Sequence, residues 1–172
     1  MQVFEGSVYG EITDKGTEKL IGLFANYFND RDGVFYDLGS GEGDLAIKVA
    51  TSTSIGKVIG VELHKERYLK SESKLKQTKL DNVSFVNEDF LKTDLSNATV
   101  IYYANEGIPK NTSNKLWDNI PKGCLLICGR RVRALDNIKK YALTTVIEKS
   151  YTKKRGNWYI IKQTNNINNK FN

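Results

Sequence analysis

The feature of this 172-residue sequence that most restricts its fold is a glycine-rich turn behind an apolar strand pattern. Val34, Phe35 and Tyr36 suit a buried strand, and the turn that comes after it carries Gly39, Gly41 and Gly43. Glycine adopts positive φ and lets another molecule approach the backbone, and the amphipathic pattern that starts at Leu45 predicts a helix whose N-terminus faces the turn. The arrangement predicts an α/β fold with a nucleotide-type cofactor at this turn.

The spacing of the glycines separates two classes of cofactor. A dinucleotide fingerprint requires G-x-G-x-x-G, but Asp44 stands where its third glycine would be. Asp37 precedes the turn, and a carboxylate there favours a cofactor with an ammonium and a sulfonium, whereas it repels a pyrophosphate. The pattern resembles motif I of class I S-adenosylmethionine-dependent methyltransferases. An ordinary glycine-rich turn of an α/β protein is the alternative.

Two later strand ends carry further carboxylates. Residues 57–61 predict a strand that ends at Glu62, one helix and one strand beyond the turn, where a carboxylate would accept both ribose hydroxyls of an adenosine group. Residues 83–86 predict a third strand that leads to Asp89 and Phe90, which suit the exocyclic amine and the edge of adenine. The alternatives are a solvent-facing glutamate and, for Asp89, a helix or turn cap.

The remaining pattern predicts a Rossmann-like class I methyltransferase fold, with a mostly parallel seven-stranded sheet, helices on both faces and a C-terminal antiparallel hairpin. One methyltransferase domain would cover residues 1–163, in which residues 1–30 form a loop and a helix that close over the cofactor, and residues 164–172 would be a disordered tail. The other predicted elements are a helix that ends near Phe28 with Thr13 as its N-cap, a surface helix over residues 65–80, strands over residues 99–104 and 124–128, a helix over residues 111–120, and hairpin strands over residues 141–147 and 158–162.

Composition restricts the partners and the compartment less sharply. With 26 basic and 20 acidic residues the net charge is +6, which favours a polyanionic neighbourhood such as nucleic acid, although lysines on solvated helices give the same total. No apolar run approaches a membrane span and the N-terminus lacks a signal-peptide pattern, so we expect an intracellular, cytoplasmic protein. Cys124 and Cys128 are expected as buried thiols on one side of a strand, and no residue set predicts a metal site.

Four segments together resemble the non-SET histone lysine methyltransferases of the disruptor-of-telomeric-silencing type, in their small prokaryotic or viral form. They are Val8-Tyr9-Gly10-Glu11, the turn at residues 37–43, Gly60-Val61-Glu62, and residues 88–91 followed by residues 100–105. The sequence departs from the family after the fourth strand, where the family has paired asparagines and aromatics but Asn105 stands here without an aromatic. The identity of the substrate is therefore left open.

The resemblance implies S-adenosylmethionine as the cofactor and a role for each matching residue. The expected cofactor-binding residues are Tyr9, Glu11 and Thr13 over the methionine end, Asp37, Gly39 and Gly41 at the turn, Glu62 on the ribose, and Asp89 with Phe90 on the adenine. The reaction that it implies is N-methylation of a lysine side chain, on a histone or another protein with an accessible lysine, which includes basic and nucleic-acid-bound proteins.

Methyl transfer to lysine requires a neutral amine, and a narrow apolar channel would favour that form by desolvation. Asn105 would orient the amine through its side-chain carbonyl. The other candidate catalytic residues are aromatic side chains that would line the channel, and for each of them core packing is the alternative: Tyr103, Trp158 and Tyr159.

Two other hypotheses stay open. An RNA or DNA methyltransferase of the same fold would agree with the positive charge, but such nucleobase enzymes usually carry two prolines and an aromatic after the fourth strand, and residues 105–108 lack both. A cofactor-binding module without catalysis would be expected to have lost Asp37 or Glu62, and both are present.

Overall fold

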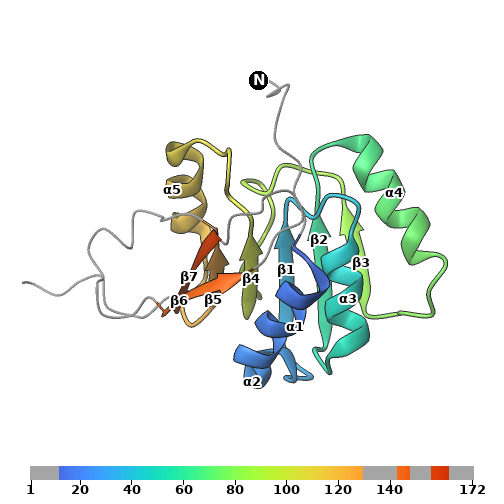
Figure 1. Cartoon of the computed structure of the whole chain (residues 1–172). Coiled ribbons are helices and arrows are strands. Elements are labelled where there is room, and N and C mark those ends of the chain that lie inside the picture. Colours follow the sequence, from blue (N-terminus) through green and yellow to red (C-terminus); the bar gives the residue numbers. More distant parts are fainter. Residues whose placement is uncertain (1–11, 130–142, 148–155, 163–172) are drawn as a thin grey trace, which may run out of the picture.

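The computed structural model describes residues 12–129 and the backbones of two further strands at residues 143–147 and 156–162. Residues 1–11, 130–142, 148–155 and 163–172 lie outside this described part (Figure 1). The predicted cofactor residues Tyr9 and Glu11 and the predicted disordered tail fall there, so those expectations stay predictions.

The described core is a parallel sheet of five strands. They are β1 (Val34–Leu38), β2 (Lys57–Val61), β3 (Val83–Val86), β4 (Val100–Tyr103) and β5 (Leu125–Cys128). Their order is β3-β2-β1-β4-β5, and every neighbouring pair is parallel. The order reverses between β1 and β4, which in an open α/β sheet is the point where ligands bind, outside the carboxyl ends of the strands. These five strands confirm the predicted α/β Rossmann-like class.

The sheet order continues past β5 with β7 (Gly156–Lys162) and then β6 (Leu143–Ile147). Their backbones pair antiparallel with each other, and β7 runs antiparallel to β5. The structure does not describe the side chains of these two strands or the segments that flank them, so the seven-stranded sheet with a C-terminal hairpin stays a prediction.

Side chains alternate between the two faces of the sheet and build two hydrophobic clusters. Phe35, Val58 and Val100 point into one cluster, whereas Tyr36, Ile59 and Ile101 point into the other. The first cluster packs against α1 (Asp14–Leu23), α2 (Ala25–Phe28), α3 (Asp44–Ser52) and α4 (Lys65–Leu75), and the second packs against α5 (Lys110–Asn119). Figure 1 shows α1, α2 and α3 together in front of the central strands. Both faces are therefore covered, as parallel sheets require.

Local structure follows the sequence with few differences. The Thr13 side chain accepts a hydrogen bond from the Gly16 N–H (3.1 Å), so the predicted N-cap is confirmed. The helical segment ends at Phe28 as predicted, but the prediction of one continuous helix is wrong. The chain leaves helical geometry at Phe24 (φ −126°, ψ 31°) and then starts the short α2. Cys124 and Cys128 are buried free thiols in one cluster, as expected, and burial raises the pKa of each to about 12.

Within the described ranges, no helix has the length and apolar character to span a bilayer. Nor do the described side chains gather three or more potential metal ligands from histidine, cysteine, aspartate and glutamate.

We predict that Gly60→Ala destabilises the fold by about 1–3 kcal/mol, the usual cost of overpacking a core. A methyl group at Gly60 in β2 would overlap the Phe85 ring and lie 2.9 Å from Ser40 Oγ. Gly22→Ala in α1 is the matched control, because no atom lies within 4 Å of the new methyl, and alanine there should stabilise the helix by about 0.5–1 kcal/mol. Urea unfolding measures both, and equal stability of the two variants would show that the contact is not tight.

Candidate functional site

The glycine-rich turn leaves the carboxyl end of β1 with a backbone that only glycine adopts easily. Gly39, Gly41 and Gly43 all have positive φ, of 81°, 57° and 86°. The N–H groups of Gly39 and Ser40 both donate to the Val61 carbonyl at the end of β2, at 2.8 and 3.0 Å. The turn is thus fixed to the neighbouring strand, and a methyl group built on Gly39 would meet no atom of the described residues within 4 Å.

Glu62 is the residue that joins the turn to the end of β2. Its side chain is buried, with 5% exposed, and Oε2 accepts a hydrogen bond from the Gly41 N–H at 2.8 Å. Its other oxygen, Oε1, accepts from the His64 N–H at 2.8 Å. A carboxylate has about four acceptor positions, so two remain for hydroxyl groups of a ligand. The position of Glu62 fits the predicted ribose contact and also gives this residue a structural role that the sequence did not indicate.

Asn87 is a site residue that sequence reasoning missed. Its Nδ2 donates to the backbone carbonyls of Glu62 (2.8 Å) and Leu63 (3.0 Å), and it therefore fixes the backbone that carries the Glu62 carboxylate. The available signal was its place directly after the third strand, since a polar residue at the carboxyl end of a parallel strand lies at the ligand edge. Leu63 was missed as well, and it is 48% exposed, so it offers an apolar surface next to Glu62.

Asp37 lies in β1 between Gly60 of β2 and Tyr102 of β4, and its side chain is buried. Its carboxyl group has a polar partner in the fold. Together with Glu62 it places two acidic side chains around the glycine-rich turn. This donor and acceptor set fits a cofactor that carries ribose hydroxyls and a positive charge, and it does not fit a pyrophosphate.

Asp89 and Phe90 follow β3, and the structure shows the alternative reading of Asp89 directly. Its Oδ1 accepts from the Leu91 N–H at 3.0 Å and its carbonyl accepts from the Lys92 N–H at 2.8 Å, so Asp89 caps a turn. The Phe90 ring packs edge-on against Tyr103, with centroids 5.3 Å apart. The turn holds both residues at the cofactor end of the sheet, and their contact with adenine stays a prediction.

The predicted catalytic residues divide into those that the structure describes and those that it does not. Tyr103 is fully buried, its hydroxyl lies 3.3 Å from Ser113 Oγ, and burial raises its pKa to about 12. It therefore packs in the core beneath Phe90, which is the alternative that the sequence left open. Asn105, two residues past the end of β4, is 1% exposed.

The aromatic residues on β7 are placed by their backbone alone. Tyr159 is in register with Cys128 of β5, and Trp158 with Thr145 of β6. Because their side chains lie outside the described part, a role in a substrate channel stays a prediction. Thr13 caps α1, and its predicted contact with the cofactor stays a prediction too.

Comparison with known proteins agrees with this geometry. Residues 29–108 match a family model described as a methyltransferase domain. A protein-lysine N-methyltransferase of Saccharolobus islandicus is 32% identical over 72 residues, which cover 41% of this chain and 45% of that protein. The match thus spans less than half the length of this curated relative.

Solved structures of methyltransferases share the fold at low sequence identity. An RNA methyltransferase from Salinibacter ruber in complex with S-adenosyl-L-homocysteine superposes with a TM-score of 0.67 at 19% identity, covering 94% of this chain and 99% of that chain. A magnesium protoporphyrin IX methyltransferase from Synechocystis with bound S-adenosylmethionine gives 0.62 at 14% identity, covering 86% and 80%. This chain thus shares the fold of these methyltransferases, whose structures hold S-adenosyl-L-homocysteine and S-adenosylmethionine respectively.

We predict that Glu62→Ala weakens binding of S-adenosylmethionine by at least tenfold. The variant would lose the two charge-assisted bonds that Glu62 is predicted to make with the ribose, worth about 1.5–3 kcal/mol each, and about 1.4 kcal/mol corresponds to tenfold in affinity. Isothermal titration calorimetry measures the change. Glu66→Ala, at an exposed position of α4, should bind like the parent protein. An unchanged affinity of the Glu62 variant would contradict the ribose assignment, and heat on titration with NAD would contradict the cofactor class.

Proposed function

We propose that this chain is an S-adenosylmethionine-dependent methyltransferase that methylates a lysine side chain of a protein, and its domain match and fold support the first part of the proposal. The observation that carries the proposal is a group of acidic side chains at the edge of the sheet where the parallel strands have their carboxyl ends. Asp37 is the penultimate residue of β1, Glu62 directly follows β2, and Glu106 lies three residues past the end of β4. Carboxylates at this edge attract a cationic cofactor and a cationic amine, and they repel the phosphates of a nucleic acid.

Glu106 follows Asn105 in the sequence, and its side chain reaches from the segment after β4 to the end of β5. Its carboxyl group occupies the space that a side chain at Gly129 would need, at the end of β5, and its Oε2 is shielded from solvent. Gly129 also donates its N–H to the carbonyl of Tyr103 in β4, at 3.4 Å. Asn105 and Glu106, an amide and a carboxylate, are therefore consecutive residues next to the switch point of the sheet. A substrate amine would meet the cofactor there.

A related protein supports the same substrate class. The relative from Saccharolobus islandicus is named as a protein-lysine N-methyltransferase, and its match with this chain supports a lysine substrate as part of the proposal. The Val8-Tyr9-Gly10-Glu11 segment supports it independently, since it resembles the loop of lysine methyltransferases.

The residues of the chain would bind and orient the amine, because the chemistry needs little else. When bound, S-adenosylmethionine supplies the methyl group: the nitrogen lone pair forms the new C–N bond as the C–S bond breaks, its electron pair stays on sulfur, and a neutral thioether leaves. Asn105 and Glu106 would hold the lysine nitrogen by hydrogen bonds. The amine loses one proton to solvent before the transfer, and the methylated ammonium can lose another afterwards.

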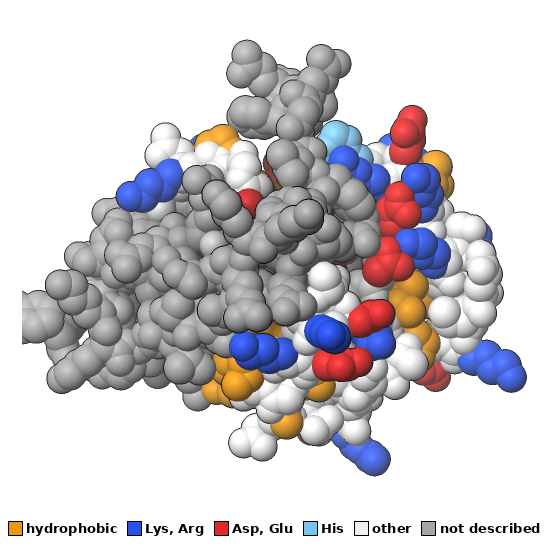
Figure 2. Space-filling model, in the orientation of Figure 1, with side chains coloured by type: hydrophobic (Ala, Val, Ile, Leu, Met, Phe, Trp, Pro, Cys, Tyr) orange, Lys and Arg blue, Asp and Glu red, His pale blue; other side chains and the backbone are white. Residues whose placement is uncertain are grey.

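Nucleic acid is the second candidate substrate, and one observation favours it. A structural neighbour with a TM-score of 0.67 is an RNA methyltransferase, although its identity of 19% extends only to the fold. On the face shown in Figure 2, basic and acidic side chains of the described residues are interspersed and do not form a basic patch. The described residues of this face therefore do not support a polyanion as the substrate.

The enzyme is incubated with tritiated S-adenosylmethionine and, in separate samples, cell lysate, histones and total RNA. We predict that the label enters protein in the first two samples and does not enter the RNA. Activity should rise between about pH 7 and 9, because a free lysine amine with a pKa near 10.4 is about 99.9% protonated at pH 7. Replacing the target lysine by arginine should abolish labelling. Label that survives protease but is released by nuclease would replace this proposal with a nucleic-acid substrate.

We predict that Glu106→Gln raises KM for the protein substrate by about tenfold, since a hydrogen bond to a charged partner contributes about 1.5–3 kcal/mol. Affinity for S-adenosylmethionine should not change. The pH profile should also move to lower pH, because the carboxylate favours the protonated amine and the amide does not. Glu66→Gln is the control. If KM and the pH profile both stay at parent values, Glu106 does not contact the amine.

A further inference from the structure

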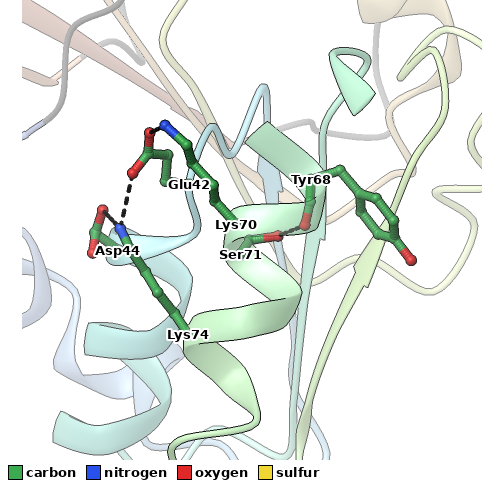
Figure 3. A network of polar contacts seen from close by, with 6 residues as sticks. All are labelled: Glu42, Asp44, Tyr68, Lys70, Ser71 and Lys74. Carbon is green, nitrogen blue, oxygen red and sulfur yellow. Dashed lines mark hydrogen bonds and ion pairs between the residues drawn. The ribbon is translucent and has the colours of Figure 1, made fainter. Parts of the chain in front are cut away.

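The glycine-rich turn is contacted from the side by α4, a helix to which neither the sequence nor the proposed function assigns a role. Two carboxylates at the turn, Glu42 and Asp44, face two lysines one helical turn apart on α4, Lys70 and Lys74 (Figure 3). We propose that these four residues, here named the α4 brace, hold the turn in its cofactor-binding conformation, with Lys74 as the positioning residue. The proposal concerns cofactor binding and is independent of the substrate.

Lys74 joins both carboxylates of the brace. Its Nζ lies 2.6 Å from Asp44 Oδ2 and 3.3 Å from Glu42 Oε2. Lys70 Nζ lies 2.8 Å from Glu42 Oε1, so Glu42 receives one lysine on each oxygen. Figure 3 shows the two lysine side chains extending from the same side of α4 towards the turn. Glu42 stands between Gly41 and Gly43, and the brace therefore acts on the turn itself.

A close apolar contact lies beside the ionic one. A methyl group at Gly43 would overlap the Phe85 ring and lie 2.8 Å from Ser71 Cβ, on the same helix as the lysines. Ser71 is fully buried, and its hydroxyl donates to the Tyr68 carbonyl within α4 at 2.7 Å. Helix α4 thus packs directly on the end of the turn, so a shift of the helix would move the turn as well.

The charges of the brace are mutually stabilised. The hydrogen bond from Lys70 is the main cause that lowers the pKa of Glu42; desolvation opposes it, and Lys74 adds to the lowering. Partial burial would lower the pKa of Lys74, but the carboxylates of Asp44 and Glu42 outweigh it and raise the pKa. The Glu42 contribution is lost as pH falls through its lowered pKa, and the Lys74 contribution is lost as pH rises through its raised pKa. Glu42 and Lys74 are therefore both charged near pH 7.

The link to cofactor affinity is the cost of ordering the turn. Its Gly41 N–H is held by Glu62, the residue predicted to bind ribose, and glycine-rich backbone has much conformational freedom to lose. A turn released from α4 would have to be ordered again when the cofactor binds, and that cost would appear as weaker binding. Ion pairs at this partly exposed position are screened by salt, so the effect should depend on ionic strength.

The test measures binding of S-adenosyl-L-homocysteine to Lys74→Met by calorimetry at low and high sodium chloride. This ligand lacks the sulfonium charge, so removing a lysine does not change affinity by relieving repulsion of a sulfonium cation. We expect Kd to rise about three- to tenfold at low salt, which corresponds to about 0.6–1.4 kcal/mol. The difference from the parent protein should shrink at high salt, and Lys74→Arg should restore most of the affinity.

Two controls separate positioning from general stability. Lys79→Met removes an exposed lysine beyond the end of α4 and should bind like the parent protein. In a double-mutant cycle, Lys74→Met with Asp44→Asn should lose little more affinity than either single variant. In turnover assays the Lys74 variant should raise KM for S-adenosylmethionine and leave kcat unchanged. A folded Lys74→Met protein with parental Kd at low salt, or equal weakening by Lys79→Met, would overturn the proposal.

Discussion

The hydrogen bond from the Gly41 N–H to the Glu62 carboxylate is the contact on which the site depends. It connects the end of β2 to a turn that leaves β1, and both strands belong to the same parallel sheet. Asn87 fixes the backbone of Glu62 from the end of β3, so the carboxyl ends of three adjacent strands are tied together. A buried carboxylate is costly unless it is hydrogen-bonded, and here the backbone N–H groups that satisfy it are those of the site itself.

The sheet order explains why these groups meet. Because β1 lies between β2 and β4, the turn after β1 faces Glu62 on one side and the segment after β4 on the other. The cofactor and the substrate edge are thereby adjacent without any long insertion. The acidic residues at this edge contrast with the net positive charge of the chain, which is +6.

Much of the fold was predictable because its signals are local. The strand at residues 57–61 and the strand at residues 83–86 were predicted with the bounds that the structure shows, and the cap at Thr13 was predicted from the residue type. The break at Phe24 was not, because an apolar helix face continues through it and only packing against the sheet ends α1 there. Predicting the turn cap at Asp89 from sequence was equally ambiguous, since a carboxylate after a strand suits a ligand and a backbone N–H alike.

The sequence by itself determined the class of the fold and the chemistry of the turn, because glycine spacing, strand patterns and strand-end carboxylates act within a few residues of one another. Only the tertiary structure decided how those parts are held. The burial of Tyr103 under Phe90, the anchoring of Glu62 by Asn87 and the ion pairs between α4 and the turn join segments far apart in the chain. Such contacts depend on strand order and on which face each side chain occupies, and hydrophobic periodicity alone does not specify which distant residues will meet there.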